Sequence, residues 1–139
     1  MILLDTNILS ELMRSEPDPV ALCWVDAQPR EEFYVSAVTR AEIGLGIALL
    51  PDGRRKQALA DAARRMFAGL PGRCVPFDES AASRYGDIVA ARVRQGRPMS
   101  VEDAQIAAIA VAGGFVLATR NVGDFTGIDG LTLVDPFSA

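Results

Sequence analysis

Four acidic side chains lie where an α/β fold would bring them together: Asp5, Glu42, Asp103 and Asp124. Asp5 directly follows the apolar run 2–4, and Asp124 lies in the loop after the apolar run 115–118. The other two fall in the first turns of expected helices. Ligands of open α/β sheets bind beyond the carboxyl ends of the strands. If the helix bearing Asp103, which follows a helix and a loop, also begins there, all four carboxylates converge on one edge.

Each of these acids also has a structural interpretation. The segments 39–42 (Thr-x-x-Glu) and 100–103 (Ser-x-x-Asp) both match the capping box of a helix N-terminus. Asp5 could cap the helix that it precedes, and Asp124 could be a turn residue. These interpretations explain each acid singly, but they leave four carboxylates near the edge of a core.

Carboxylates at the edge of a core need partners, because unpaired buried charge is costly. Few basic residues adjoin the four acids in sequence apart from Arg40 and Arg120. The nearby donors are oxygens of Asp, Glu, Asn and Thr, which favour a hard ion such as Mg²⁺ or Mn²⁺ over zinc or copper. The usual work of Mg²⁺ is phosphoryl chemistry, in which it activates water and stabilises charge on a phosphate oxygen.

The composition excludes several other kinds of chemistry. The 139 residues include no histidine, which excludes His-based triads, His general bases and His-ligated zinc or iron. Lys56 is the single lysine, and acidic residues give a net charge of −4. Cys23 and Cys74 have no CxxC pairing and cannot form a zinc site. The sequence leaves a disulfide between them open, but a chain this rich in apolar residues does not need one, and we expect both to be buried thiols in a reducing cytoplasm.

The charge is divided unevenly along the chain. Residues 54–97 hold 10 of the 14 basic residues and carry a net charge of +6, whereas the remainder carries −10. A globally acidic protein can therefore present a basic face. This segment either forms solvated helix faces or contacts a phosphate backbone.

The segments that must position these residues alternate between strand and helix patterns. Apolar or β-branched runs predict strands at 2–4, 33–36, 74–77, 115–118 and 131–134, with Pro76 placing 74–77 at a sheet edge or strand end. Periodic segments predict helices after residue 5, from Pro19 to Pro29, and at 39–50, 54–70, 78 or 80 to 93, and 100–113. This order indicates one α/β domain over residues 1–139, with a mainly parallel sheet covered on both faces. No run approaches the roughly 20 apolar residues of a membrane span, and we expect no signal peptide.

Four segments resemble a known family. Residues 1–11 (MILLDTNILSE) resemble the opening of PIN-domain proteins, in particular the VapC-type toxins of bacterial toxin–antitoxin pairs. Residues 41–46, 103–110 and 117–125 resemble the second, third and fourth acidic motifs of that family. The resemblance extends over the whole chain, with all four acidic positions intact.

The resemblance implies a fold, an activity and partners. The fold is a three-layer α/β/α sandwich, and the activity is Mg²⁺- or Mn²⁺-dependent endoribonuclease cleavage of RNA. By match, Asp5, Glu42, Asp103 and Asp124 are the catalytic and metal-binding quartet, supported by Thr6, Asn7, Thr119 and Asn121. The partners would be a cognate antitoxin, a second copy of the chain in a homodimer, and DNA reached through the antitoxin in a higher assembly. We expect a cytoplasmic protein.

Two rival interpretations belong to other classes. A phosphatase of the haloacid dehalogenase type also opens with a strand and an Asp, but it needs Asp-x-Asp where position 7 is Asn, and a lysine late in the chain. A catalytically silent PIN-like module that mainly engages an antitoxin would keep the fold without the chemistry. Cleavage assays with and without metal distinguish these alternatives.

Overall fold

The central sheet has five parallel strands in the order β3-β2-β1-β4-β5. The computed structural model describes residues 1–138, and the strands are β1 (Ile2–Leu4), β2 (Phe33–Ser36), β3 (Cys74–Val75), β4 (Val116–Ala118) and β5 (Thr132–Val134). Leu4 lies opposite Val35 on one side and Ala118 on the other. The first strand is therefore central, which explains why it has no polar face.

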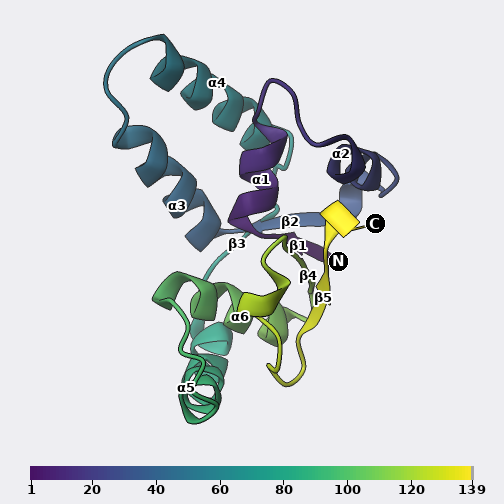
Figure 1. Ribbon diagram of the computed structural model, residues 1–139, viewed down its shortest axis with the longest axis vertical. Helices are drawn as coiled ribbons and strands as arrows, with labels where there is room; N and C mark the ends of the chain where they lie inside the picture. The colour runs from purple at the N-terminus through teal and green to yellow at the C-terminus, as the bar shows by residue number, and fades with distance from the viewer. Residues whose placement is uncertain (139) are drawn as a thin grey trace.

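Helices cover both faces of this sheet (Figure 1). The helices are α1 (Thr6–Leu12), α2 (Pro19–Asp26), α3 (Ala37–Ala48), α4 (Arg54–Ala68), α5 (Glu79–Arg94) and α6 (Val101–Gly113). Leu3 and Leu117 point to the core formed with α5 and α6. Leu4 and Ala118 point to the core formed with the other four helices. The predicted three-layer sandwich is confirmed.

Most helix ends follow the capping residues of the sequence. Asp18 caps α2, Asp78 caps α5 and Ser100 caps α6, each accepting from a backbone N–H of the first turn. The helix expected from residue 39 begins two residues earlier, because the Ser36 hydroxyl at the end of β2 accepts from the Thr39 N–H. The strand expected at 74–77 is shorter, as Pro76 offers no N–H to a ladder; it lies at the sheet edge, as predicted.

The prediction of two buried thiols is wrong. Cys23 and Cys74 are both exposed and unpaired within residues 1–138. Cys23 lies on α2, a short apolar helix whose Val20 and Leu22 are also exposed, and Cys74 lies on the edge strand. An apolar sequence context therefore did not predict burial for residues at the periphery of the fold. No helix among the described residues is long and apolar enough to cross a membrane.

Candidate functional site

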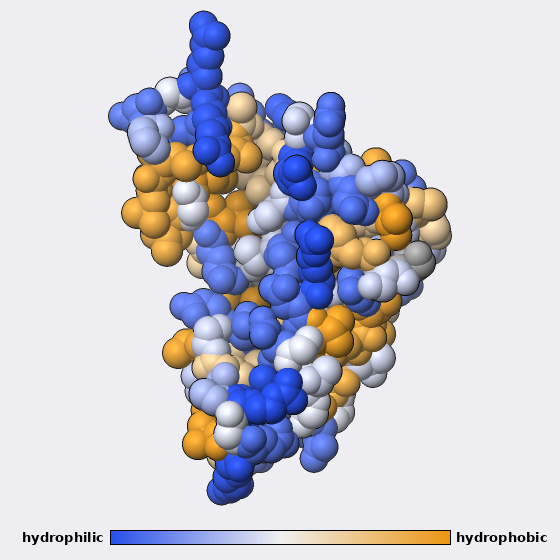
Figure 2. Space-filling view, in the orientation of Figure 1, coloured by the Kyte–Doolittle hydropathy of each residue, from blue (hydrophilic) through white to orange (hydrophobic). Residues whose placement is uncertain are grey.

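A hollow of about 550 Å³ lies at the carboxyl edge of β1, where α3 contacts both α1 and α6. It is lined by Asp5, Thr6, Asn7, Ser10, Glu11, Arg14, Glu42, Asp103 and Asn121. Figure 2 shows hydrophilic side chains across the waist of the molecule, between the hydrophobic surface over α3 and α4 and the half that contains α5 and α6. Three of the four predicted carboxylates thus share one hollow.

Asp5 occupies the centre of this edge. It is 4% exposed, and one carboxylate oxygen accepts from the Thr6 N–H at 2.8 Å as the N-cap of α1. The other oxygen accepts from the Thr119 hydroxyl at 2.8 Å. The structural and functional interpretations of Asp5 are therefore compatible, since the cap uses one oxygen and leaves the carboxylate at the hollow.

Thr119 connects the two strand ends that meet here. Its buried hydroxyl donates to Asp5 and accepts from the Asn121 N–H at 3.1 Å and from the Asn7 side chain at 3.4 Å. A hydroxyl has one proton to donate and two lone pairs, so its hydrogen-bonding capacity is full. Asn7 in turn accepts from the Arg120 N–H at 3.3 Å. These residues fix the geometry around Asp5.

Glu42 projects into the hollow from the second turn of α3. It accepts from the Thr6 hydroxyl at 2.7 Å, and the Thr39 hydroxyl lies 3.0 Å from that of Thr6. Because Ser36 caps α3, Thr39 lies inside the helix, and the capping-box interpretation of residues 39–42 is wrong. Glu42 is half-buried and held by a hydroxyl, with no helix end for it to cap.

Asp103 lies in the first turn of the buried helix α6. The Ser100 hydroxyl accepts from the Asp103 N–H at 3.1 Å, so the N-cap is Ser100 and the Asp103 carboxylate lines the hollow. Burial raises the pKa of Asp103, and the negative charges of Asp5, Asp124 and Glu42 contribute, bringing it to about 6. The α6 helix does begin at the carboxyl edge of the sheet, although α5 precedes it.

Burial also raises the pKa of Asp5 above its ordinary value. The hydrogen bonds from Thr119 and Thr6 oppose this shift, and the charges of Glu42 and Asp124 add to it. None of the four carboxylates forms a salt bridge within residues 1–138. The site therefore holds more negative charge than its surroundings neutralise.

Asp124 stands apart from the other three acids. It is exposed at the end of a 3₁₀ turn over Val122–Asp124 and does not line the hollow. It is nevertheless close enough for its charge to raise the pKa of both Asp5 and Asp103. The structure thus places all four predicted acids at one edge, three within the hollow and Asp124 beside it.

Glu11 is a site residue that the sequence reasoning missed. Its side chain is 7% exposed, pairs with Arg14 at 3.1 Å and accepts from the Asp18 N–H at 3.0 Å. Asn7, Ser10 and Glu11 recur at helical spacing, so the polar face of α1 was the signal that pointed to this hollow. Unlike the four predicted acids, Glu11 already has a cationic partner.

The donor set of the hollow fits a hard divalent cation. Carboxylate, hydroxyl and amide oxygens are available, and neither Asp5 nor Asp103 has a cationic partner among residues 1–138. Among the described residues, no group of three or more acidic side chains stands close enough to bind one ion. This suits Mg²⁺, which takes one or two carboxylates directly and keeps several waters.

The basic segment 54–97 is divided between the two faces of the molecule, on α4 and on α5. Several of its cations serve the fold: Arg92 is buried, Lys56 donates to the Ala48 carbonyl and Arg73 stacks on Tyr34. The segment therefore does not form one continuous basic face. Its contact with a phosphate backbone stays a prediction for the exposed members.

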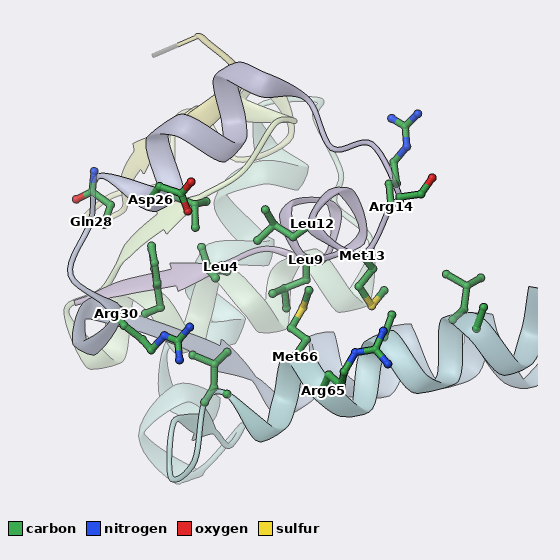
Figure 3. A pocket seen from close by; sticks show the side chains of 18 of the residues that line it. Leu4, Leu9, Leu12, Met13, Arg14, Asp26, Gln28, Arg30, Arg65 and Met66 are labelled. Atoms are coloured by element: carbon green, nitrogen blue, oxygen red, sulfur yellow. The ribbon is translucent and has the colours of Figure 1, made fainter.

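A larger hollow of about 1100 Å³ lies between α1, α2 and α4. Leu9, Leu12 and Met66 face it, and Arg14, Arg30 and Arg65 stand at its rim (Figure 3). We call it the apolar groove. Arg14 also lines the acidic hollow, so the two spaces adjoin along α1.

Fold and site together define an α/β protein with an acidic cluster at the carboxyl edge of a parallel sheet. The PIN domain model matches residues 2–130, and the chain belongs to the PIN-domain family. It is 41% identical over 138 residues to the VapC ribonuclease Y4jK of Sinorhizobium fredii, covering 99% of this chain and 98% of that protein. It is 38% identical over 130 residues to Toxin FitB of Neisseria gonorrhoeae, covering 93% and 94% respectively. A solved structure of FitAB bound to an IR36 DNA fragment superposes with a TM-score of 0.90 at 36% identity, over 99% of this chain and 96% of that one.

Proposed function

We propose that this chain is a metal-dependent endoribonuclease and the toxin of a toxin–antitoxin pair. The observation that carries the proposal is the acidic hollow, where buried Asp5 and half-buried Asp103 have raised pKa values and no cationic partner. The similarity to a VapC ribonuclease and to a toxin supports RNA as the substrate. Hydrolysis of a phosphodiester bond needs only carboxylates and a metal, which agrees with a sequence without histidine.

The four acids divide into two roles in this proposal. Asp5 and Asp103 would hold Mg²⁺ or Mn²⁺, with the negative charge of Asp124 beside them, and a bound ion would supply water activation and charge neutralisation at the scissile phosphate. Glu42 orients the attacking water or takes its proton, and the Thr6 hydroxyl fixes its carboxylate. Thr119 holds Asp5 in place, and Asn7 and Asn121 support Thr119.

The apolar groove supports a protein partner for the toxin. Its apolar wall and basic rim suit an amphipathic acidic segment, and we assign it to the antitoxin. The similarity to a DNA-bound FitAB complex supports an assembly that reaches DNA through the antitoxin. A homodimer is part of the same proposal, and light scattering of the purified chain tests it.

Cleavage by the purified chain tests the proposed activity. Structured and single-stranded RNA are incubated with Mg²⁺, Mn²⁺ or EDTA, beside Asp5→Asn. We expect cleavage only by the wild type and only with metal. Equal cleavage by wild type and variant, or cleavage unaffected by EDTA, would overturn the mechanism. No cleavage of any RNA, together with no metal-dependent thermal shift, would favour a silent binding module.

Toxicity is tested separately from cleavage. Induced expression of the wild-type chain in bacteria should arrest growth, whereas Asp5→Asn at the same protein level should not. Equal growth of the two cultures would contradict a role as a toxin.

A further inference from the structure

Arg92 is a buried arginine whose hydrogen bonds all go to backbone carbonyls. It is 4% exposed and has no carboxylate partner among the described residues. Its Nε donates to the Arg97 carbonyl at 2.8 Å and its Nη1 to the Thr126 carbonyl at 2.6 Å. A buried guanidinium is costly unless its N–H groups are hydrogen-bonded. The carbonyls of Arg97 and Thr126 must therefore stay within reach of the Arg92 side chain.

Arg97 extends the same arrangement to the surface. Its backbone N–H donates to the Arg92 carbonyl at 2.9 Å. Its Nη2 donates to the Gly123 carbonyl at 2.6 Å and to the Thr126 hydroxyl at 3.0 Å. The two guanidiniums therefore bond to residues 123 and 126, on either side of Asp124.

Asp124 lies between these hydrogen-bonded neighbours in the loop. Its carboxylate is exposed and makes no hydrogen bond among residues 1–138. The next residue, Phe125, is 1% exposed and anchors the loop in the core. On the other flank, the Asn121 N–H donates to Thr119, which donates to Asp5. The loop is thus tied to Asp5 at one end and to Arg92 and Arg97 at the other.

We propose that Arg92 and Arg97 are positioning residues that hold the Asp124 carboxylate beside Asp5 and Asp103 in the geometry that metal binding and cleavage require. This inference rests on the proposed function and deepens it, since it assigns the placement of the fourth acid. Groups that orient metal ligands from outside the site typically matter 10- to 100-fold in affinity or activity, so an effect of about that size is expected.

We call Arg92, Arg97 and their hydrogen bonds to residues 123 and 126 the clamp. Arg97→Gln tests the clamp at an exposed position, and Arg94→Gln is the matched control. Arg94 is also an exposed arginine at the end of α5, but its side chain makes no hydrogen bond in the described part of the chain. For Arg97→Gln we expect kcat to fall about 10- to 100-fold with an unchanged KM for RNA, and Mn²⁺ to bind more weakly by calorimetry. Amide hydrogen exchange should accelerate at residues 122–126, and the melting temperature should stay that of Arg94→Gln.

A second variant, Arg92→Lys, keeps the charge but cannot bond both carbonyls in the same fork. Arg92→Lys should also lower kcat and Mn²⁺ affinity. The size of both losses should follow the increase in amide exchange at residues 122–126. Faster exchange with unchanged kcat and Mn²⁺ affinity would overturn the proposal. So would a raised KM with unchanged kcat, which would make Arg97 an RNA contact. If the wild type cleaves no RNA, the proposed function fails, and unchanged Mn²⁺ affinity and exchange in Arg97→Gln would separately overturn the clamp.

Discussion

The Thr119 hydroxyl controls how easily Asp5 is ionised. Burial raises the pKa of Asp5, and the hydrogen bond from Thr119 is the strongest of the effects that lower it. The same hydroxyl accepts from Asn7 and from the Asn121 backbone. One side chain therefore favours the ionised form of Asp5 and also anchors the loop that leads to Asp124.

Thr119→Val keeps the shape of the side chain and removes its hydrogen bonds. The pKa of Asp5 should rise further, so Mn²⁺ must displace a proton more often and should bind about 10- to 100-fold more weakly. The loss should be larger at pH 6 than at pH 8, because a rising pH favours the ionised carboxylate in both proteins. Calorimetry at the two pH values measures this, with Thr132→Val on the exposed part of β5 as control. An equal loss at both pH values would contradict the role assigned to the hydroxyl.

Asp103 should make the metal-free protein less stable as pH rises. Its pKa is about 6 in the folded chain against the ordinary aspartate value of 3.8, so the folded state binds the proton more tightly. The free energy of unfolding therefore falls between about pH 4 and 6, and the penalty is complete above pH 6. In EDTA, Asp103→Asn should melt higher than the wild type at pH 7.5, and this advantage should disappear at pH 4. Asp129→Asn, in an exposed loop, is the control. An advantage that persists unchanged at pH 4 would contradict this account.

At the scale of elements, local pattern predicted most of what is seen. The run of apolar residues in α6 predicted a central helix, and Ala104 and residues 106–110 are at most 2% exposed. The strand runs and their capping residues placed the ends of most elements within two residues. The pattern of α2 was misleading, because a short apolar helix at the periphery has too few neighbours to cover both its sides.

Gly114 ends α6 in the left-handed conformation, with φ of +70°. Gly114→Ala should cost about 1–2 kcal/mol of the free energy of unfolding, because a Cβ is strained in that conformation even with open space around it. Gly123→Ala is the control, since it has no positive φ and a Cβ there meets nothing within 4 Å. Urea denaturation measures both. Equal stability of the two variants would show that α6 does not need this cap.

At the scale of the whole molecule, the site was only partly predictable. Motifs predicted the four acids, and parallel topology predicted the edge at which they meet. Glu11 and the contacts of Arg92 and Arg97 were not predicted, because they depend on how α1 faces the hollow and on how residues 92–97 pack against the loop 123–126. Hydrogen bonds such as that of Arg92 to residue 126 join positions 34 residues apart, and no local periodicity encodes them.

A bound divalent ion should stabilise the entire fold. An ion that binds only the folded state adds about 2.7 kcal/mol at a concentration 100 times its Kd, so Mn²⁺ should raise the melting temperature and EDTA should reverse the rise. Asp5→Asn should lose this shift. Glu102→Gln, an exposed acid next to Asp103, should keep it. A shift that survives in Asp5→Asn would place the ion elsewhere.

The hydrogen bond between Asp5 and Thr119 joins residues that are 114 positions apart in the sequence, so Thr119 is synthesised long after Asp5. Translation at about 5–20 residues per second takes about 7–28 s for a chain of 139 residues. For most of that time the central strand β1 lacks its neighbour β4, and the acidic hollow lacks one wall. The proposed cleavage therefore needs residues from both ends of the fold, and a chain that stops before β4 should cleave no RNA.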